Sequence, residues 1–557
     1  MAEQPIHEDG SSKRWAHGAL ALMILLASAV LIFARLGHYA LWDDEATTAL
    51  SGIGVWRTGD TTAVIDHNIA AYESGKELRN LHFRYMPPLP SYMAAPFVGL
   101  MGNSALAARL PFAIAGLISI AILLWWLYRD EASALVVGLF GIGLLGNVSL
   151  FLHFRNARYY SPAILFCVAL AYLYFHWDGR RRPLFFFSIL SLGLWTSNYL
   201  IYVALYACLA VDYFLWQRKE RPLGVKDWLA LLLPQIIIGI PLVLVWNPFS
   251  AKDLHIEAYE SLTDKLVLLW YNLRDSDLNE RGPTLLLLLA PALYCATRDK
   301  RLFRGAVALL VFILAITFAS HHIGGRTATG DMRFLAPLIP LSLFLGAVAI
   351  HIICRGQWWL ALPLALVAFA TNFLQIYPYY FFQGFRFQLQ PDNYLQGFHS
   401  TPLFYAGELL NPPNDPYTEA AKWINANIGA KQTIWTLPFY TTYPLMYHAP
   451  KALYAWQISY PPEAQFQALD PIHFRGVVAP DYIIAFGRVG REDFQLFREL
   501  KSRGGGYDAP QTLDVFGRDL YNPELYSHAF GPVTDFDRGA DAVYIFKRAA
   551  PGSRGAK

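Results

Sequence analysis

Long apolar segments separated by short polar loops occupy the first two thirds of the chain. A membrane span needs about 20 apolar residues to cross roughly 30 Å of hydrocarbon. Segments of this kind predict eleven spans, near 16–36, 106–128, 132–152, 160–177, 183–198, 199–217, 228–247, 283–297, 305–320, 334–353 and 357–377. We therefore predict an α-helical polytopic membrane protein whose transmembrane domain covers 16–377, after a cytoplasmic N-terminus at 1–15.

The apolar segment 86–101 is interpreted differently. It opens with Pro87 and Pro88, contains two further prolines and is short for a span, so we interpret it as a helix lying at the membrane interface. With that assignment every short inward loop carries Lys or Arg, as inward loops do in general. The opposite assignment places nearly all of these clusters outside. The pattern predicts a multi-pass protein of the cytoplasmic (inner) membrane.

Three larger segments then face outward, at 37–105, 248–282 and 378–557. The last is the most polar and is predicted to be an extracytoplasmic α/β domain. Asp415 followed by Pro416 is typical of a helix start. Apolar positions in the next twelve residues repeat at helical spacing. Strands are predicted at 433–437, 481–485 and 543–546, and no Gly-rich phosphate loop accompanies them, so we predict no nucleotide site.

Composition agrees with the membrane assignment and excludes other classes. The chain has 557 residues, of which 55% are hydrophobic and 16% charged, against about 25% charged in soluble domains. The net charge of +3 is too small for a nucleic-acid-binding surface. All four cysteines lie in or beside apolar segments, so they predict no disulfide framework for the outer regions.

Three successive carboxylates, Asp43, Asp44 and Glu45, follow the first span directly. Like charges at a membrane boundary repel one another and lose hydration, so their placement needs a reason. One reason is a general base that takes a proton from a hydroxyl group, or a ligand for substrate or a cation. The alternative is a solvated loop that merely begins there. Mg²⁺ or Mn²⁺ is a possible cofactor, although no metal ligands are assigned.

The end of the first outer loop carries His82 and Arg84 just before the prolines. Tyr85 and Tyr92 are typical of anchors at the headgroup level. We expect His82 and Arg84 to lie beside the acidic cluster. The alternative is that both are interfacial anchors as well.

Arginines also occur on predicted outer edges, against the bias toward inward positive charge. Arg155 and Arg158 lie between the third and fourth spans, and Arg333 begins the tenth. A lipid phosphate is a natural partner for such cations. Contact with ordinary outer-leaflet phosphates is the alternative. We expect Arg158, Arg333 and the acidic cluster to converge on one wet cavity that opens away from the cytosol.

These residues form a series of motifs that resembles a known family. The series comprises Trp42-x-Asp44-Glu45, Pro87-Pro88-Leu89, Ala108-Arg109-Leu110-Pro111, Ala157-Arg158-Tyr159-Tyr160-Ser161 and Arg333-Phe334-x-x-Pro337-x-x-Pro340. It resembles the GT-C glycosyltransferases, in the branch of the protein O-mannosyltransferases and lipid A aminoarabinose transferases (glycosyltransferase family 39). The resemblance covers roughly residues 16–380. It implies an inverting sugar transferase that uses a polyprenyl-phosphate-linked donor on the outer face of the membrane.

The resemblance also implies roles for individual residues. Asp44 matches the catalytic aspartate and Glu45 its neighbour, although Asp43 stays open as the base because the sequence does not say which carboxylate faces the cavity. Further site residues are expected to hold the donor phosphate (Arg158, Arg333, Arg84 and Tyr159) or to line the substrate site (His82, Arg155, Asn198 and Tyr199).

Two positions depart from the family pattern. Met86 stands where relatives often have Lys or His, and His82 or Arg84 is expected to supply that cation. Asn198 precedes Tyr199 where relatives often have His-Tyr. Both departures leave the donor sugar open.

The acceptor is expected to be a cell-envelope glycan, a lipid or a protein. Two other classes remain, a flippase or transporter of lipid-linked saccharides and a non-catalytic membrane scaffold. A transporter is expected to place charges near the bilayer midplane and to show internal repeats, whereas here the charges gather at the outer edge and no repeat is found. A scaffold is expected to tolerate alanine in the acidic cluster.

Overall fold

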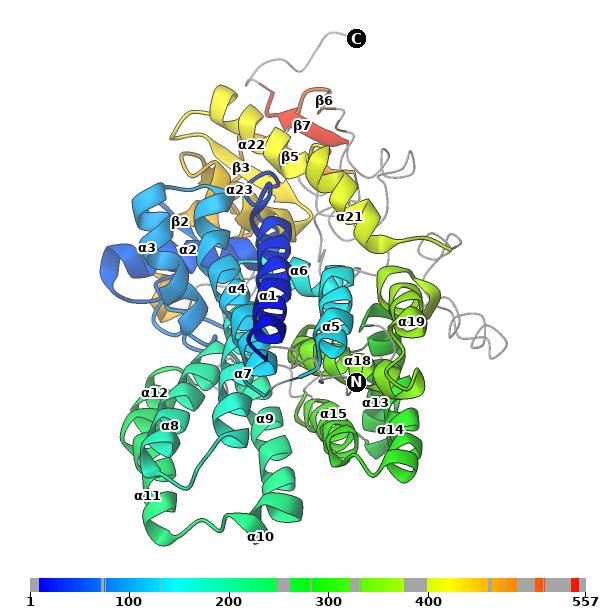
Figure 1. Ribbon diagram of the computed structural model, residues 1–557. Helices are drawn as coiled ribbons and strands as arrows, with labels where there is room; N and C mark the ends of the chain where they lie inside the picture. Colours follow the sequence, from blue (N-terminus) through cyan, green and yellow to red (C-terminus); the bar gives the residue numbers. More distant parts are fainter. Residues whose placement is uncertain are drawn as a thin grey trace, which may run out of the picture.

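The computed structural model of the chain describes residues 10–71, 75, 77–130, 132–247, 261–280, 283–320, 330, 332–374, 398–458, 463–475, 477–487, 506–513, 515 and 542–549. A helical body forms one part, and a smaller α/β part lies at one end of it together with the first outer segment (Figure 1). The predicted boundary between 377 and 378, much of the predicted loop 248–282 and most of the N-terminal tail lie outside the described residues.

The helical body is built mostly from apolar helices. They are α1 (Gly10–Phe33), α4 (Ala105–Arg129), α5 (Ala134–Gly146), α6 (Val148–Phe154), α7 (Tyr160–Phe175), α8 (Arg181–Ser197), α9 (Tyr199–Asp212), α10 (Arg218–Glu220), α11 (Val225–Pro234), α12 (Ile240–Val245), α13 (Leu262–Glu280), α14 (Pro283–Thr297), α15 (Lys300–Ala319), α17 (Met332–Leu335), α18 (Ile339–Ile353) and α19 (Trp358–Ala370). Polar residues begin several of them, because the side chains of Ser104, Ser133 and Asn198 accept hydrogen bonds from the first helical turn.

Within the described residues, six helices are long and apolar enough to cross a membrane, and a seventh span results if one bent pair is counted as one. Four more apolar helices are shorter. The chain is a multi-pass membrane protein, and the expected number of eleven spans stays a prediction.

The span predicted at 132–152 is wrong as one continuous helix. The structure divides it into α5 and α6, which meet at an angle of 67°. Asn147 separates them, and its side chain accepts a hydrogen bond from the amide of Leu150, so it starts a new helix. Gly146 lies against the backbone of Phe369, where a side chain has no room. The bend directs α6 toward the acidic cluster.

The first outer segment forms α2 (Asp43–Thr58), a short hairpin of β1 (Val64–Ile65) and β2 (Asn68–Ile69), and α3 (Leu89–Met101). The helix predicted within 86–101 is confirmed, and it packs along α2 and against α4. Its place at the membrane interface stays a prediction. Gly59 ends α2 with a φ of 80°, a left-handed conformation that favours glycine.

The C-terminal part is an α/β structure, as predicted. It contains α21 (Thr401–Leu410), α22 (Pro416–Asn427), α23 (Thr442–His448) and a five-stranded sheet of order β4-β3-β5-β7-β6. The strands are β3 (Thr433–Leu437), β4 (Leu453–Tyr454), β5 (Tyr482–Phe486), β6 (Gln511–Leu513) and β7 (Val543–Lys547), which confirms all three predicted strands. β3 pairs in parallel with β4 and β5, whereas β7 runs antiparallel to β5 and β6.

The first outer segment and the C-terminal part share one apolar core. Residues of α2, α3 and the hairpin pack with residues of α22, α23 and the sheet in a single buried cluster. Polar contacts join the same two regions. The amide of Ala40 donates to Asp415 at 3.3 Å, and the amide of Leu41 donates to Nε2 of His448 at 3.0 Å. The chain just before α2 is therefore held by residues that lie some 375 positions away.

Candidate functional site

Glu45 and Arg109 form a buried ion pair at the start of α2. Nε and Nη2 of Arg109 donate to the two carboxylate oxygens at 2.8 and 2.6 Å, in a bidentate arrangement. The side chains are 1% and 10% exposed. The remaining donors of Arg109 reach the carbonyls of Leu36, Tyr39 and Ala40 at 2.8 to 3.2 Å. Arg109 thus ties α4 to the chain that leads from α1 into α2.

Glu45 accepts two more hydrogen bonds, from backbone amides. Its Oε1 accepts from Ala157 at 2.8 Å, and its Oε2 accepts from Trp42 at 3.3 Å. A carboxylate so fully bonded and buried has little room for a substrate. The catalytic role expected for Glu45 stays a prediction, and the geometry supports a positioning role better.

Asp44, the residue before Glu45, contacts two arginines from other elements. Its Oδ1 lies 2.8 Å from Nη1 of Arg158, and its Oδ2 lies 4.0 Å from Nη1 of Arg333. Arg158 comes from the loop between α6 and α7, and Arg333 from α17. The structure therefore brings the acidic cluster and both expected arginines together. The side chains of Asp44, Arg158 and Arg333 are 16%, 10% and 33% exposed, so this cluster is partly exposed whereas Glu45 is fully buried.

Asp43 begins α2 beside Asp44. Burial raises the pKa of Asp43 well above its ordinary value, and the charge of Asp44 raises it further, against an opposing effect of Arg158. Within the described part of the chain, its Oδ1 is buried and has no hydrogen-bond partner. Asp43 and Asp44 are adjacent but differ in their surroundings, and such pairs of carboxyl groups often have different roles in catalysis.

Aromatic side chains line the same cluster. The guanidinium of Arg158 lies over the rings of Tyr159 and Trp42, at 5.4 and 6.0 Å from their centroids. Tyr159 stacks on Phe334, next to Arg333. Burial raises the pKa of Tyr85, and the charges of Glu77 and Asp44 raise it further, so this tyrosine belongs to the electrostatic surroundings of the cluster. The sequence had suggested only a headgroup anchor there.

Among the described residues, the ion pairs of His82 and Arg84 are with Asp60 and not with the acidic cluster. Arg84 binds Asp60 through two hydrogen bonds of 2.7 and 2.5 Å, and Nε2 of His82 lies 3.6 Å from the same carboxylate. Backbone pairing of Thr62 with His82 brings the end of the loop to Asp60, so this carboxylate is the nearer partner. Arg84 also lies over the ring of Trp246, at 5.4 Å. The roles of both residues in the site stay predictions.

Three other expected site residues have clear local contacts. Nη1 of Arg155 donates to the carbonyls of Leu31, Ile32 and Ala34, which end α1, at 2.7 to 3.2 Å. Asn198 accepts from the amide of Ile201 as the N-cap of α9. The hydroxyl of Tyr199 donates to the carbonyl of Trp246 at 3.4 Å. None of these contacts is with Asp44, and their substrate roles are untested.

No three His, Cys, Asp or Glu side chains of the described residues gather as ligands for a metal ion. Asp44 is paired with Arg158, and a second cation, Arg333, lies beside it. Positive neighbours of this kind disfavour a divalent cation at Asp44 but suit an anion between the two arginines.

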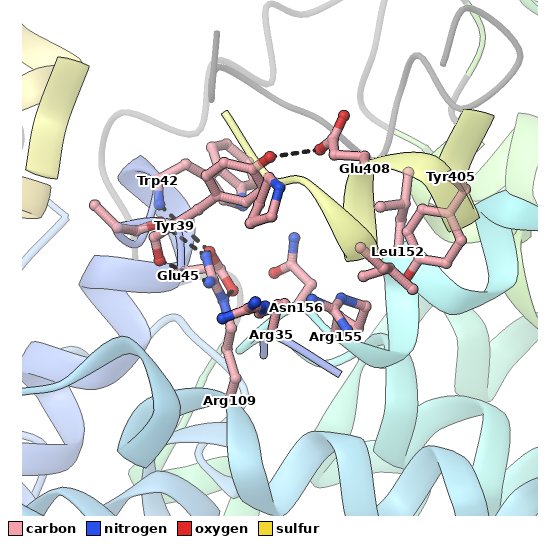
Figure 2. A pocket seen from close by; sticks show the side chains of 13 residues that line it. Arg35, Tyr39, Trp42, Glu45, Arg109, Leu152, Arg155, Asn156, Tyr405 and Glu408 are labelled. Atoms are coloured by element: carbon pink, nitrogen blue, oxygen red, sulfur yellow. Dashed lines mark hydrogen bonds and ion pairs between the residues drawn. The ribbon is translucent and has the colours of Figure 1, made fainter. Parts of the chain in front are cut away.

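A second pocket lies next to this site, with a cavity of about 80 Å³. Glu45 and Arg109 form part of its wall, together with side chains from the ends of α1 and α6 and from α21. Figure 2 shows the polar residues that surround it, which include Arg35, Tyr39, Arg155, Asn156 and Glu408.

Comparison with solved structures identifies the fold. A crystal structure of ArnT from Cupriavidus metallidurans in the apo state matches with a TM-score of 0.55 and 12% identity, over 90% of this chain and 96% of that one. The chain has a GT-C fold. The structure of ArnT bound to undecaprenyl phosphate matches with the same TM-score and identity, over 99% of this chain and 100% of that one. No family model and no curated protein matches the sequence.

The sequence did not predict the contacts of several polar residues in this region. Arg109 appeared in a motif, but its position inside an apolar span was the available sign that it needs a buried carboxylate. Asp60 carries no such sign, because it lies in a polar segment where a carboxylate is ordinary. Glu408 is the only charged residue of the apolar helix α21, but that pattern does not say which residue is its partner. Their partners come from elsewhere in the fold.

Proposed function

We propose that this protein transfers a sugar from a polyprenyl-phosphate-linked donor to a hydroxyl group on the outer face of the cytoplasmic membrane. The acceptor would be a cell-envelope glycan, a lipid or a protein. The observation that carries the proposal is the convergence of Asp44, Arg158 and Arg333 from three separate elements. A carboxylate and two cations at a partly open site are what such a transfer needs from a protein.

The arginines would bind the phosphate of the donor. Guanidinium groups hold phosphate oxygens through charge-assisted hydrogen bonds. The phosphate becomes the leaving group, so its negative charge grows as the bond to the sugar breaks. Arg158 and Arg333 would then stabilise the transition state more strongly than the bound donor.

Asp44 would act as the general base. Asp44 is paired with Arg158, and an incoming phosphate would take over that arginine and release the carboxylate. Asp44 then accepts the proton of the acceptor hydroxyl while the acceptor oxygen bonds to the anomeric carbon. The bond from this carbon to the phosphate oxygen breaks, and the polyprenyl phosphate leaves. Attack opposite the phosphate inverts the anomeric configuration. Burial raises the pKa of Asp43 and so disfavours its charged form, which is why we assign the base to Asp44, the carboxylate beside Arg158.

The fold supports the donor class. ArnT, which has the same fold, has been crystallised with undecaprenyl phosphate, and a polyprenyl phosphate would place its headgroup at the outer edge of the membrane, where Arg158 and Arg333 are predicted to lie. The C-terminal α/β part packs directly over the start of α2. We propose that it forms the acceptor-binding side of the site.

The test is transfer by the purified protein. Full-length protein in detergent is incubated with polyprenyl-phosphate sugars and with envelope glycans, lipids or peptides, and the products are identified by mass spectrometry. A glycosylated product that requires Asp44 supports the proposal. Movement of the lipid-linked sugar across a vesicle membrane without any new glycosidic bond would overturn it in favour of a flippase.

A further inference from the structure

The pocket in Figure 2 is distinct from the proposed donor site. Its wall includes Glu45 and Arg109 but none of Asp44, Arg158 and Arg333. Its cavity of about 80 Å³ is several times the roughly 10–15 Å³ that admits a single water molecule. The pocket is therefore large enough for a small polar group, and the proposed transfer does not use it.

Two of its arginines are not neutralised by acidic side chains. Among the described residues, no carboxylate lies within 4 Å of a guanidinium nitrogen of Arg35 or Arg155, as an ion pair would require. Arg155 uses Nη1 for the carbonyls at the end of α1, yet a guanidinium has five N–H donors. Arg155 feels the charge of Glu408 but forms no direct ion pair with it. Burying a cation without such a pair is costly, and an anion in the pocket would offset part of that cost.

The acidic residues of the pocket are already engaged. Glu45 is neutralised by Arg109, and Glu408 accepts a hydrogen bond of 2.6 Å from the hydroxyl of Tyr39. Three arginines thus face two glutamates, and in Figure 2 Arg35, Asn156 and Arg155 lie side by side below Glu408. This floor offers N–H donors for an anion, whereas Glu408 opposes it from above.

We propose that this pocket binds a phosphate group and is a second anion subsite beside the Asp44 site. Guanidinium forks and an amide fit the oxygens of a phosphate monoester or diester. The phosphate would belong either to the headgroup of an outer-leaflet lipid or glycolipid, because α1 ends here, or to a soluble phosphate ester.

The subsite is connected to the Asp44 site through one short segment. Arg155 and Asn156 line the pocket, the amide of Ala157 binds Glu45, and Arg158 binds Asp44. A phosphate bound to Arg155 and Asn156 would order these four consecutive residues, and with them the partner of Asp44. Binding is therefore expected to stabilise the folded protein.

The test measures binding by the full-length protein in detergent. Sodium phosphate is titrated against the melting temperature, with sodium chloride at matched ionic strength, and retention of phosphatidylglycerol is followed by native mass spectrometry. We expect Arg35→Gln to weaken binding of the responding probe at least fivefold. Arg57→Gln is the matched control, because Arg57 is an exposed arginine of the same outer region, paired with Asp66, and should bind as the natural protein does.

A second variant guards against a mere folding defect. Glu408→Gln removes the opposing negative charge and is expected to strengthen phosphate binding, a gain that misfolding does not produce. If phosphatidylglycerol binds and Arg35→Gln weakens this binding, the subsite is assigned to a lipid headgroup. If only phosphate binds and Arg35→Gln weakens it, the subsite is assigned to a soluble phosphate ester. No binding of either probe, or equal binding by all variants, overturns the proposal. Asp44→Asn should still bind, so failure of the transfer proposal leaves this one standing.

Discussion

Asp44 and Glu45 are consecutive acidic residues, yet their surroundings differ in burial and in hydrogen bonding. Glu45 is 1% exposed and has four hydrogen bonds, all inside the protein. Asp44 is 16% exposed and has one close arginine and one at 4.0 Å. The closed side fixes the position of α2, and the open side leaves charge available to a ligand. A rigid neighbour is what allows a partly open carboxylate to keep its geometry.

The largest expected effect lies on the open side. Asp44→Asn should lower the rate of sugar transfer by about 10³-fold, within the range that general bases contribute, while the protein keeps its fold. Transfer by purified protein and the melting temperature are measured together. Asp44→Glu keeps the carboxylate and serves as the control for charge. If Asp44→Asn transfers sugar at the natural rate, the open side is not the site of chemistry.

On the closed side the expected loss is one of stability. Glu45→Gln leaves Arg109 buried with an uncharged partner, which should cost roughly 3 kcal/mol, since removing one member of a buried pair is strongly destabilising. Denaturant or thermal unfolding in detergent measures this loss. The exposed pair of Arg57 and Asp66 is the comparison, because Arg57→Gln should cost less than about 1 kcal/mol. Equal losses of stability for the two pairs would show that the buried Glu45–Arg109 pair contributes no more than an exposed one.

The stability of the protein should also depend on pH, through a histidine of the C-terminal part that contacts the chain before α2. Burial, with a smaller effect of Arg109, lowers the pKa of His448 from 6.5 to about 3, and its neutral ring accepts the amide hydrogen of Leu41. The unfolded chain then binds more protons than the folded one between these two pKa values, so stability falls as pH decreases through that window. From pH 7 to pH 5 the loss should reach about 2 kcal/mol.

His448→Gln should flatten this dependence of the melting temperature on pH. The exposed His67 provides the control, because His67→Gln should leave the dependence as it is in the natural protein. An unchanged pH profile in His448→Gln would show that the ring is not held neutral against Leu41.

The smallest effect is expected at Arg84, which binds Asp60 and not the acidic cluster. Arg84→Gln should change the rate of transfer at saturating donor less than tenfold, whereas Arg158→Gln should reduce it 10²-fold or more, as loss of a donor to a developing anion does. Steady-state kinetics with both variants measures the difference. A loss at Arg84 as large as that at Arg158 would return Arg84 to the phosphate site.

The sequence predicted those features that depend on local pattern. Apolar segments predicted the helices of the membrane part, the Asp-Pro start predicted α22, and short segments rich in apolar residues predicted β3, β5 and β7. Asp44, Arg158 and Arg333 could be named together because each follows or begins an apolar segment at the same predicted edge of the membrane. Their convergence in the structure follows from that topology.

The sequence did not predict which side chains far apart in the chain pair with one another. Nothing in the local pattern distinguishes Glu45 from Asp44, because the difference arises from Arg109, 64 positions further on. Arg84 was expected beside the acidic cluster, whereas the backbone pairing of Thr62 with His82 brings it to Asp60. The break at Asn147 had a local sign, a capping residue after glycine in an apolar run, but the direction of the bend depends on packing against Phe369.

The contacts of Ala40 and Leu41 with Asp415 and His448 set an order of events during synthesis. Ribosomes add about 5–20 residues per second, so the chain before α2 waits roughly 20–80 seconds for the residues that hold it. Until then Arg109 is available to hold this segment, but the contacts from Asp415 and His448 are missing. Premature release from the ribosome before residue 415 would therefore give a membrane-embedded fragment in which Ala40 and Leu41 lack both of these partners.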